Sequence, residues 1–142
     1  MRLSALDRLH LMWAWAQSEK SRDPSTRVGA ILREANQAVY HSNHNTFMTL
    51  RKPEEATREE RYADVLHAEE ACLLSAGPAA MGATIYCTHE PCGRCWRKLL
   101  HMGVARVVFN RTTPDRRERW ACQGGRDAAE RAGVVIQEVL PT

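Results

Sequence analysis

Two short segments constrain this chain more than any other part of it: His67-Ala68-Glu69 and, later, Pro91-Cys92-Gly93-Arg94-Cys95. They offer one imidazole, two thiols and a carboxylate that lies two residues from the imidazole. Imidazole nitrogen and thiolate sulfur are the usual protein ligands of zinc, and a nearby carboxylate that need not bind metal is suited to proton transfer. A fold that uses these groups together must bring the two segments to one place.

The hydrophobic periodicity around these segments predicts an α/β domain. We expect helices over 4–21, 67–75, 92–101 and 120–132 and strands over 28–32, 38–41, 83–88, 106–109 and 134–139. The first two strands form an antiparallel hairpin, and the later strands alternate with helices and therefore pair in parallel. The prediction is a single domain over 1–142 with a three-layer α/β/α fold, in which a mixed five-stranded sheet carries helices on both faces.

Local signals support several of these elements. Ser4 and Asp7 resemble a capping box at the start of the first helix. Asp64 is a candidate cap for the helix that contains Glu69. The long polar segment from Asn43 to about Ala63 is expected to be a functional loop or a solvated surface excursion, with Thr57 to Tyr62 as a turn of helix.

In this arrangement both halves of the metal site fall at helix starts that flank one strand. A helix N-terminus carries partial positive charge, which favours the thiolate forms of Cys92 and Cys95. With His67 they make three ligands, and an open fourth position is typical of a catalytic site, where bound water has a pKa of roughly 7. Glu69 would then carry protons. A closed structural site would need a fourth ligand, for which His89 or Cys87 are candidates.

Composition and charge indicate where the protein is located and which partners it binds. The chain has 142 residues, five cysteines and a formal net charge of +3. No stretch approaches the roughly 20 apolar residues of a membrane span, and the N-terminus is charged and amphipathic rather than signal-like, so we expect a cytoplasmic protein with free thiols. Arg111, Arg116, Arg117 and Arg119 form a basic cluster. Asp115 and Glu118 interrupt it, which favours a solvated face over a polynucleotide surface.

Several segments together resemble a known family. They are Asp23-Pro24-Ser25-Thr26-Arg27-Val28-Gly29-Ala30, Asn43, His67-Ala68-Glu69, Gly82-Ala83-Thr84-Ile85-Tyr86, Pro91-Cys92-Gly93-Arg94-Cys95 and Gly103-Val104. The pattern H-x-E followed by P-C-x-x-C is the signature of zinc nucleobase deaminases. With the block before Ala30, the chain is similar to the cytidine deaminase-like superfamily, and most closely to its deoxycytidylate (dCMP) deaminase family.

The resemblance implies an activity and a set of roles. The activity is zinc-dependent hydrolysis of dCMP to dUMP and ammonia, which supplies thymidylate synthesis. The implied roles are zinc ligation by His67, Cys92 and Cys95, proton transfer by Glu69, contact with the sugar by Asn43, a backbone N–H from Ala68 to the pyrimidine carbonyl, and contact with the 5′-phosphate by Arg27. The family also implies a homo-oligomer, a hexamer or a dimer, and deoxynucleoside triphosphates as effectors.

The chain departs from the family pattern around the substrate, and this leaves alternatives open. His41-Ser42-Asn43-His44 replaces a Gly-aromatic-Asn-Gly run, and Ala71 stands where the family has an asparagine. A 5-substituted cytosine or another phosphate state would fit these changes. Thr88–Cys92 also resembles the tRNA adenosine deaminases. A zinc-stabilised binding module without activity is the remaining alternative, and Glu69 argues against it.

Overall fold

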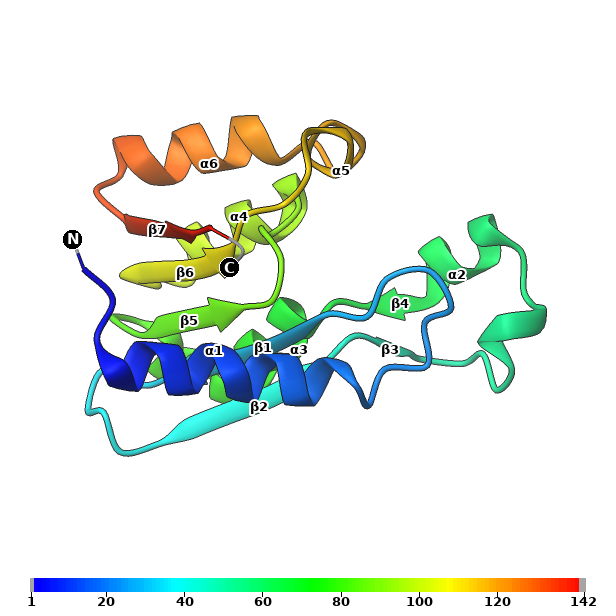
Figure 1. Cartoon of the computed structure of the whole chain (residues 1–142), viewed down its shortest axis with the longest axis horizontal. Coiled ribbons are helices and arrows are strands. Elements are labelled where there is room, and N and C mark those ends of the chain that lie inside the picture. The colour runs from blue at the N-terminus through cyan, green and yellow to red at the C-terminus, as the bar shows by residue number, and fades with distance from the viewer. Residues whose placement is uncertain (1, 141–142) are drawn as a thin grey trace.

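The computed structural model describes residues 2–140, and their elements follow one another along a single chain (Figure 1). The α-helices are α1 (Ala5–Ser18), α2 (Arg58–Asp64), α3 (Ala68–Ala76), α4 (Gly93–His101), α5 (Pro114–Arg119) and α6 (Cys122–Arg131). The strands are β1 (Gly29–Arg33), β2 (Tyr40–His44), β3 (Thr46–Phe47), β4 (Val65–Leu66), β5 (Thr84–Cys87), β6 (Arg106–Asn110) and β7 (Val135–Val139). Two short 3-10 helices, η1 (Pro53–Glu55) and η2 (Gly77–Ala80), complete the set.

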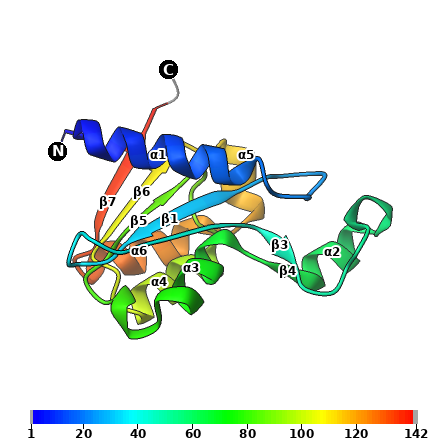
Figure 2. The ribbon, with the colours of Figure 1, turned by 90° about the horizontal axis from the view of Figure 1, so that it is seen from below.

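The five longer strands form one mixed sheet in the order β2-β1-β5-β6-β7. β1 is antiparallel to both β2 and β5, and β5, β6 and β7 are parallel to one another. Figure 2 shows α1 on one face of this sheet and α3, α4 and α6 on the other. The predicted hairpin, mixed sheet and three layers are therefore confirmed.

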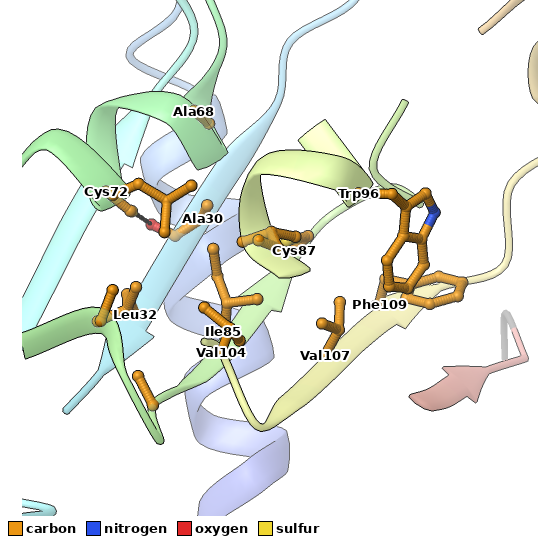
Figure 3. Packing of buried hydrophobic residues seen from close by; sticks show 14 of the residues in the cluster. Ala30, Leu32, Ala68, Cys72, Ile85, Cys87, Trp96, Val104, Val107 and Phe109 are labelled. Atoms are coloured by element: carbon orange, nitrogen blue, oxygen red, sulfur yellow. Dashed lines mark hydrogen bonds between the residues drawn. The ribbon is translucent and has the colours of Figure 1, made fainter. Parts of the chain in front are cut away.

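The larger core lies beneath the three-helix face. It joins alternate residues of the central strands, such as Ile85, Cys87, Val107 and Phe109, to Trp96 of α4 (Figure 3). The strand residues between them point the other way, as a period of two requires. Tyr86 and Val108 accordingly pack with Leu11 and Ala14 of α1 in a second, smaller core.

Close backbone contact fixes α1 on β1. A Cβ atom added at Gly29 would lie 1.9 Å from the carbonyl oxygen of Ala14, so only glycine permits this approach. The predicted capping box is present, because Ser4 Oγ accepts from the Asp7 N–H at 3.0 Å and Asp7 Oδ2 accepts from the Ser4 N–H at 2.9 Å. The helix ends at Ser18, three residues earlier than predicted.

The polar segment before the site is an ordered arm. It contains β3, η1, α2 and β4 and projects from the body of the molecule (Figure 2). The predicted turn of helix over 57–62 is present as α2, and Thr57 caps it, since its Oγ1 accepts from the Glu60 N–H at 3.1 Å. Asp64 does not cap α3; it ends α2 and accepts from the N–H groups of Thr49 and Leu50 at 2.8 and 2.9 Å. Local hydrogen bonds thus stabilise the arm.

Two further differences from the prediction are a strand end and an additional helix. Strand β2 continues to His44 rather than ending at His41, because its last residues pair with Gly29 and Ala30 of β1. The short helix α5 was not predicted, although Thr113 and Pro114 form a typical helix start. Within residues 2–140, none of the helices combines the length and the apolar character needed to span a membrane.

Candidate zinc centre

The folded chain brings the two segments together at the ends of two neighbouring helices. His67 is the N-cap of α3, where its N–H donates to Glu70 Oε1 at 2.9 Å. Cys92 is the N-cap of α4, and Cys95 lies in the first turn of that helix. Because α4 directly follows β5, its N-terminus lies at the carboxyl end of the central strand. The predicted convergence of the two helix starts is confirmed.

The three ligand groups have the spacing that zinc requires. His67 Nδ1 lies 3.4 Å from Cys95 Sγ and 3.7 Å from Cys92 Sγ, and the ligand atoms all lie within 4.8 Å of one another. Tetrahedral zinc with usual bond lengths places nitrogen and sulfur about 3.5 Å apart. The donor set and its geometry therefore fit a zinc ion without rearrangement of the backbone.

The group has three members among the described residues, which leaves one tetrahedral position open. Neither candidate for a closing ligand joins it. Cys87 is fully buried in β5, and burial raises the pKa of its thiol well above the usual range. His89 Nδ1 instead lies 2.8 Å from Thr88 Oγ1, and its ring packs between Trp15 and Trp120. An open position of this kind is the mark of a catalytic zinc site.

The centre already contains a thiolate, Cys92, to which a cation can bind. Hydrogen bonding from Cys95 and His67 lowers the pKa of Cys92 to about 4. The Cys92 sulfur in turn raises the pKa of His67 to about 9 and, by the shared hydrogen bond, raises the pKa of Cys95. Without metal, the centre therefore holds one thiolate beside protonated partners, and zinc replaces those protons.

Glu69 lies in the first turn of α3 and is 4% exposed. Burial raises its pKa to about 7. Within residues 2–140, its carboxylate forms no side-chain hydrogen bond and no ion pair, whereas the adjacent Glu70 pairs with Lys98. A carboxyl group with a pKa near neutrality can both accept and release a proton, as general acid–base catalysis requires.

A cavity of about 390 Å³ opens onto this centre. Its volume is in the range of small-molecule sites. The lining residues are Asp23, Ser25, Thr26, Val28, Asn45, Arg58, Arg61, Tyr62, Val65, His67, Ala68, Glu69, His89, Glu90, Cys92, Arg94, Arg119 and Trp120. The arm supplies part of this wall, so the long polar segment shapes the site.

Two of the residues assigned to substrate by resemblance do not line this cavity. Asn43 lies within β2, and its Nδ2 donates to Cys72 Sγ at 3.7 Å. Arg27 is half exposed and lies 3.6 Å from Glu19. Their substrate roles remain predictions. Ala68 is fully buried and does line the cavity beside Glu69.

The structure places Asn45, rather than Asn43, at the cavity. Asn45 Oδ1 accepts from the Val28 N–H at 2.9 Å, and its Nδ2 donates to Thr26 O at 2.9 Å and Asp23 Oδ2 at 3.3 Å. Because β2 runs to His44, Asn45 is the asparagine that follows the second strand. A strand that ended at His41, as predicted, would put Asn43 in this position instead.

Glu90 stabilises the segment that leads into Pro91-Cys92. Its side chain is fully buried and accepts from Arg117 Nε at 2.6 Å and Trp96 Nε1 at 3.2 Å, with Arg126 Nη1 at 3.5 Å. These contacts tie α4, α5 and α6 to the residue just before Pro91-Cys92. This role of Glu90 was not predicted; the one signal in the sequence is its position directly before Pro91-Cys92.

The comparisons with known proteins agree with this geometry. Residues 5–111 match the model of the cytidine and deoxycytidylate deaminase zinc-binding region. An uncharacterised deaminase of Aliivibrio fischeri, encoded in the luxG 3′ region, is 34% identical over 119 residues, which cover 82% of this chain and 81% of the relative. Mouse deoxycytidylate deaminase is 24% identical over 105 residues, covering 68% of this chain and 59% of the mouse protein.

Solved structures share the fold. The dCMP deaminase of cyanophage S-TIM5 in its apo form has a TM-score of 0.73 at 21% identity, covering 97% of this chain and all of that chain. Acinetobacter baumannii RibD has a TM-score of 0.65 at 24% identity, covering 93% of this chain and 34% of that chain. With the family match and the His67, Cys92 and Cys95 cluster, these findings identify the chain as a zinc-dependent hydrolytic deaminase that belongs to the cytidine and deoxycytidylate deaminase family.

Proposed function

We propose that the chain deaminates a cytosine nucleotide, dCMP, to dUMP. One observation carries the proposal: the buried Glu69 lines the same cavity as the predicted zinc ligands His67 and Cys92, and that cavity has an arginine-rich rim. The solved cyanophage enzyme of the same fold has been seen with dCMP and dUMP. A nucleoside monophosphate fits such a cavity, because its flat base can lie at the inner end and its phosphate anion can contact the arginines at the rim.

The reaction replaces the amino group at C4 of cytosine with oxygen, consumes one water and releases ammonia. His67, Cys92 and Cys95 would hold a zinc ion, which would lower the pKa of a water molecule to about 7 and so supply a nucleophile near neutral pH. Glu69 would accept one proton of that water and deliver it to ring N3 as the oxygen bonds to C4. It would then take the second proton from the new C4 hydroxyl group and pass it to the amine, which leaves as ammonia. Its pKa of about 7 suits both directions of transfer.

The cavity wall offers groups for the base and the sugar. Ala68 is the first residue of α3, and the N–H groups of a first turn have no partner within the helix. We assign this N–H to the pyrimidine carbonyl. Asn45 uses both amide hydrogens and one lone pair of Oδ1 within the protein. The second lone pair of Oδ1 is available to a sugar hydroxyl.

Two arginines of the rim are the best candidates for the phosphate. Arg94 projects from α4, is exposed, and forms no ion pair within residues 2–140. Arg119 from α5 has one ion-pair partner among the described residues, the exposed Asp115 at 3.2 Å. An exposed pair of this kind is weak, so a phosphate dianion can replace Asp115. Arg61, in contrast, is already bound to the Ala56 carbonyl at 2.7 Å. The planar guanidinium group matches phosphate oxygens in pairs.

The proposal is tested by ammonia release from cytidine, deoxycytidine, dCMP, dCTP, 5-methyl-dCMP, guanine and adenosine-containing tRNA. We expect the highest kcat/KM with dCMP. Arg94→Gln and Arg119→Gln should each raise KM for dCMP by about tenfold and leave KM for deoxycytidine unchanged. Arg131→Gln, an exposed arginine of α6 outside the cavity, is the matched control.

Two outcomes would change the assignment. Turnover of tRNA without turnover of any cytosine nucleotide would overturn the substrate class and favour the adenosine deaminase alternative. A raised KM for dCMP in Arg27→Gln, with Arg94→Gln and Arg119→Gln unaffected, would return the phosphate contact to the residue that the family resemblance indicated.

A further inference from the structure

A second cavity, of about 440 Å³, lies beside the catalytic one, and His89 lines both. It opens at the carboxyl ends of the three parallel strands, because Thr88 follows β5, Asn110 ends β6 and Val139 ends β7. Ligands of open α/β sheets bind at this end of the strands. The lining residues are Trp15, Thr88, His89, Asn110, Arg111, Thr112, Thr113, Arg116, Val139 and Leu140.

The wall of the second cavity is positively charged. Arg111 and Arg116 line it, and the described residues of the wall include no aspartate or glutamate. Burial and the nearby Arg116 lower the pKa of His89 to about 4, so the imidazole is neutral at pH 7 and the two guanidinium groups supply the charge. A concave wall with two guanidinium groups and no carboxylate favours an anion.

Arg116 lacks an anionic partner. It is partly buried, and its guanidinium group forms no ion pair and no hydrogen bond with the other residues of 2–140. The group lies over the ring of Trp120, 5.8 Å from the ring centre. Moving a charged group partly out of water without an opposite charge costs free energy, and an anion that pairs with Arg116 would recover it.

The solvated face expected for the basic cluster therefore describes only part of it. Arg117 is bound to the buried carboxylate of Glu90 at 2.6 Å. Arg111 is exposed, and its ion-pair partner Glu138 lies 3.8 Å away, so this pair is weak. Arg111 and Arg116 are thus the members of the cluster that are available to a ligand of the second cavity.

We propose that the second cavity binds one phosphate group, held by Arg111 and Arg116. A phosphate monoester carries about 1.5 to 2 negative charges at pH 7, which two guanidinium groups balance. Thr113 Oγ1 accepts from the Arg116 N–H at 3.3 Å, so its own hydrogen is free for a phosphate oxygen. The effectors implied by the family carry three phosphate groups, more charge than this wall balances. The inference does not depend on the substrate of the catalytic cavity.

The second cavity is larger than a phosphate group alone requires. Trp15, which is 44% exposed, and the side chains of Val139 and Leu140 give it an apolar part. The phosphate group is therefore either a free ion or part of a small monoester whose organic part contacts Trp15.

The test is calorimetric titration of inorganic phosphate into the full zinc-loaded chain. The double variant Arg94→Gln/Arg119→Gln is the starting protein, because it lacks the phosphate contacts that we propose for the catalytic cavity. We expect it to bind one phosphate ion per chain with a Kd of about 1 mM. Adding Arg116→Gln should weaken this binding by at least about tenfold. Adding Arg131→Gln, the matched control outside both cavities, should leave it unchanged. Thermal melts of each variant check that the fold is intact.

Titrations with ribose 5-phosphate and dCTP identify the source of the phosphate group. Tighter binding of ribose 5-phosphate than of phosphate, with the difference lost in Trp15→Leu, would support the proposal and assign the site to a monoester. Equal or weaker binding of ribose 5-phosphate would support it and assign the site to the free ion. No phosphate binding at about 10 mM, or binding that Arg116→Gln does not weaken, would overturn the proposal. So would Arg116-dependent binding of dCTP at least about tenfold tighter than that of phosphate, because the site would then hold a triphosphate.

Discussion

At the scale of single residues, the proposed activity depends most on Glu69. It is buried beside the candidate metal ligands and lines the cavity, and we propose that its carboxyl group is the acid–base group of the reaction. Glu69→Gln keeps the size of the side chain but removes its ability to accept a proton. We expect ammonia release to fall by at least about 10²–10⁴-fold.

Zinc content, measured on the same samples by mass spectrometry of the metal, should stay at one ion per chain. Glu118→Gln on α5, outside the cavity, is the matched control and should keep full activity. A Glu69→Gln variant with near-normal turnover would mean that another group carries the proton, and it would revive the idea of a zinc site that only stabilises the fold.

A second decisive residue lies far from the site. The Asp7 carboxylate accepts from Arg106 Nη1 and Nη2 at 2.9 Å and from Tyr86 Oη at 2.7 Å, and so joins α1 to the sheet. These contacts, led by the Arg106 guanidinium, hold the pKa of Asp7 well below its usual range. Since the folded-state pKa is depressed, the stabilisation is present above the unfolded pKa of about 3.9 and is lost as pH falls below it.

We therefore expect Asp7→Asn to lower the free energy of unfolding at pH 7 by about 3 kcal/mol, because it leaves Arg106 without its charge partner. The variant should also lose part of the decline in stability that the wild type shows below pH 4. Urea unfolding between pH 3 and pH 7 measures both effects. Parallel pH curves for the two proteins would show that the ion pair is not the source of the acid sensitivity.

At the scale of elements, the packing of α6 on α4 depends on Gly125, although glycine inside a helix ordinarily destabilises it. A Cβ atom at Gly125 would lie 2.5 Å from Trp96 Cβ and 2.9 Å from the Gly93 carbonyl oxygen. The neighbouring Gly124 has room, since the same atom would lie 3.4 Å from Arg97 Nη2. Two adjacent helical glycines thus serve different purposes.

Gly124→Ala and Gly125→Ala form a matched pair. Alanine favours a helix over glycine by about 1 kcal/mol, so Gly124→Ala should raise the free energy of unfolding by up to that amount. At Gly125 the clash outweighs this gain, and we expect a loss of about 1–3 kcal/mol. Urea denaturation distinguishes the two, and stabilisation by both would refute the close approach of α6 to α4.

The elements also show what sequence alone can and cannot predict. The order of strands and helices, the hairpin, and the metal residues at helix starts follow from periodicity and capping, which are local signals. The end of β2 at His44 does not, because pairing with Gly29 and Ala30 continues the strand through polar residues. Asn45 and Arg94 line the cavity because of how distant segments pack together, which local sequence patterns do not predict. The family resemblance, which indicated Asn43 and Arg27, contains no information on this packing.

At the scale of the whole molecule, zinc connects two helices that the sheet already holds in place. His67 belongs to α3 and Cys92 and Cys95 to α4, while the core beneath them consists of apolar residues such as Ile85, Trp96 and Phe109. Chelation should therefore leave a folded but less stable chain. We expect lower thermal stability in EDTA with unchanged far-ultraviolet circular dichroism, and recovery with zinc.

Zinc uptake should also release protons in a pH-dependent way. At pH 7 the metal-free centre holds a proton on His67, whose pKa is about 9, and another on Cys95, while Cys92, with a pKa of about 4, holds none. Binding therefore releases about two protons, and zinc affinity should rise with pH, less steeply above pH 9, where His67 has lost its proton but Cys95 still holds one. Calorimetry in buffers of different ionisation enthalpy counts these protons. Release of none would mean that the metal-free centre is already fully deprotonated, and affinity would then be flat between pH 6 and pH 9.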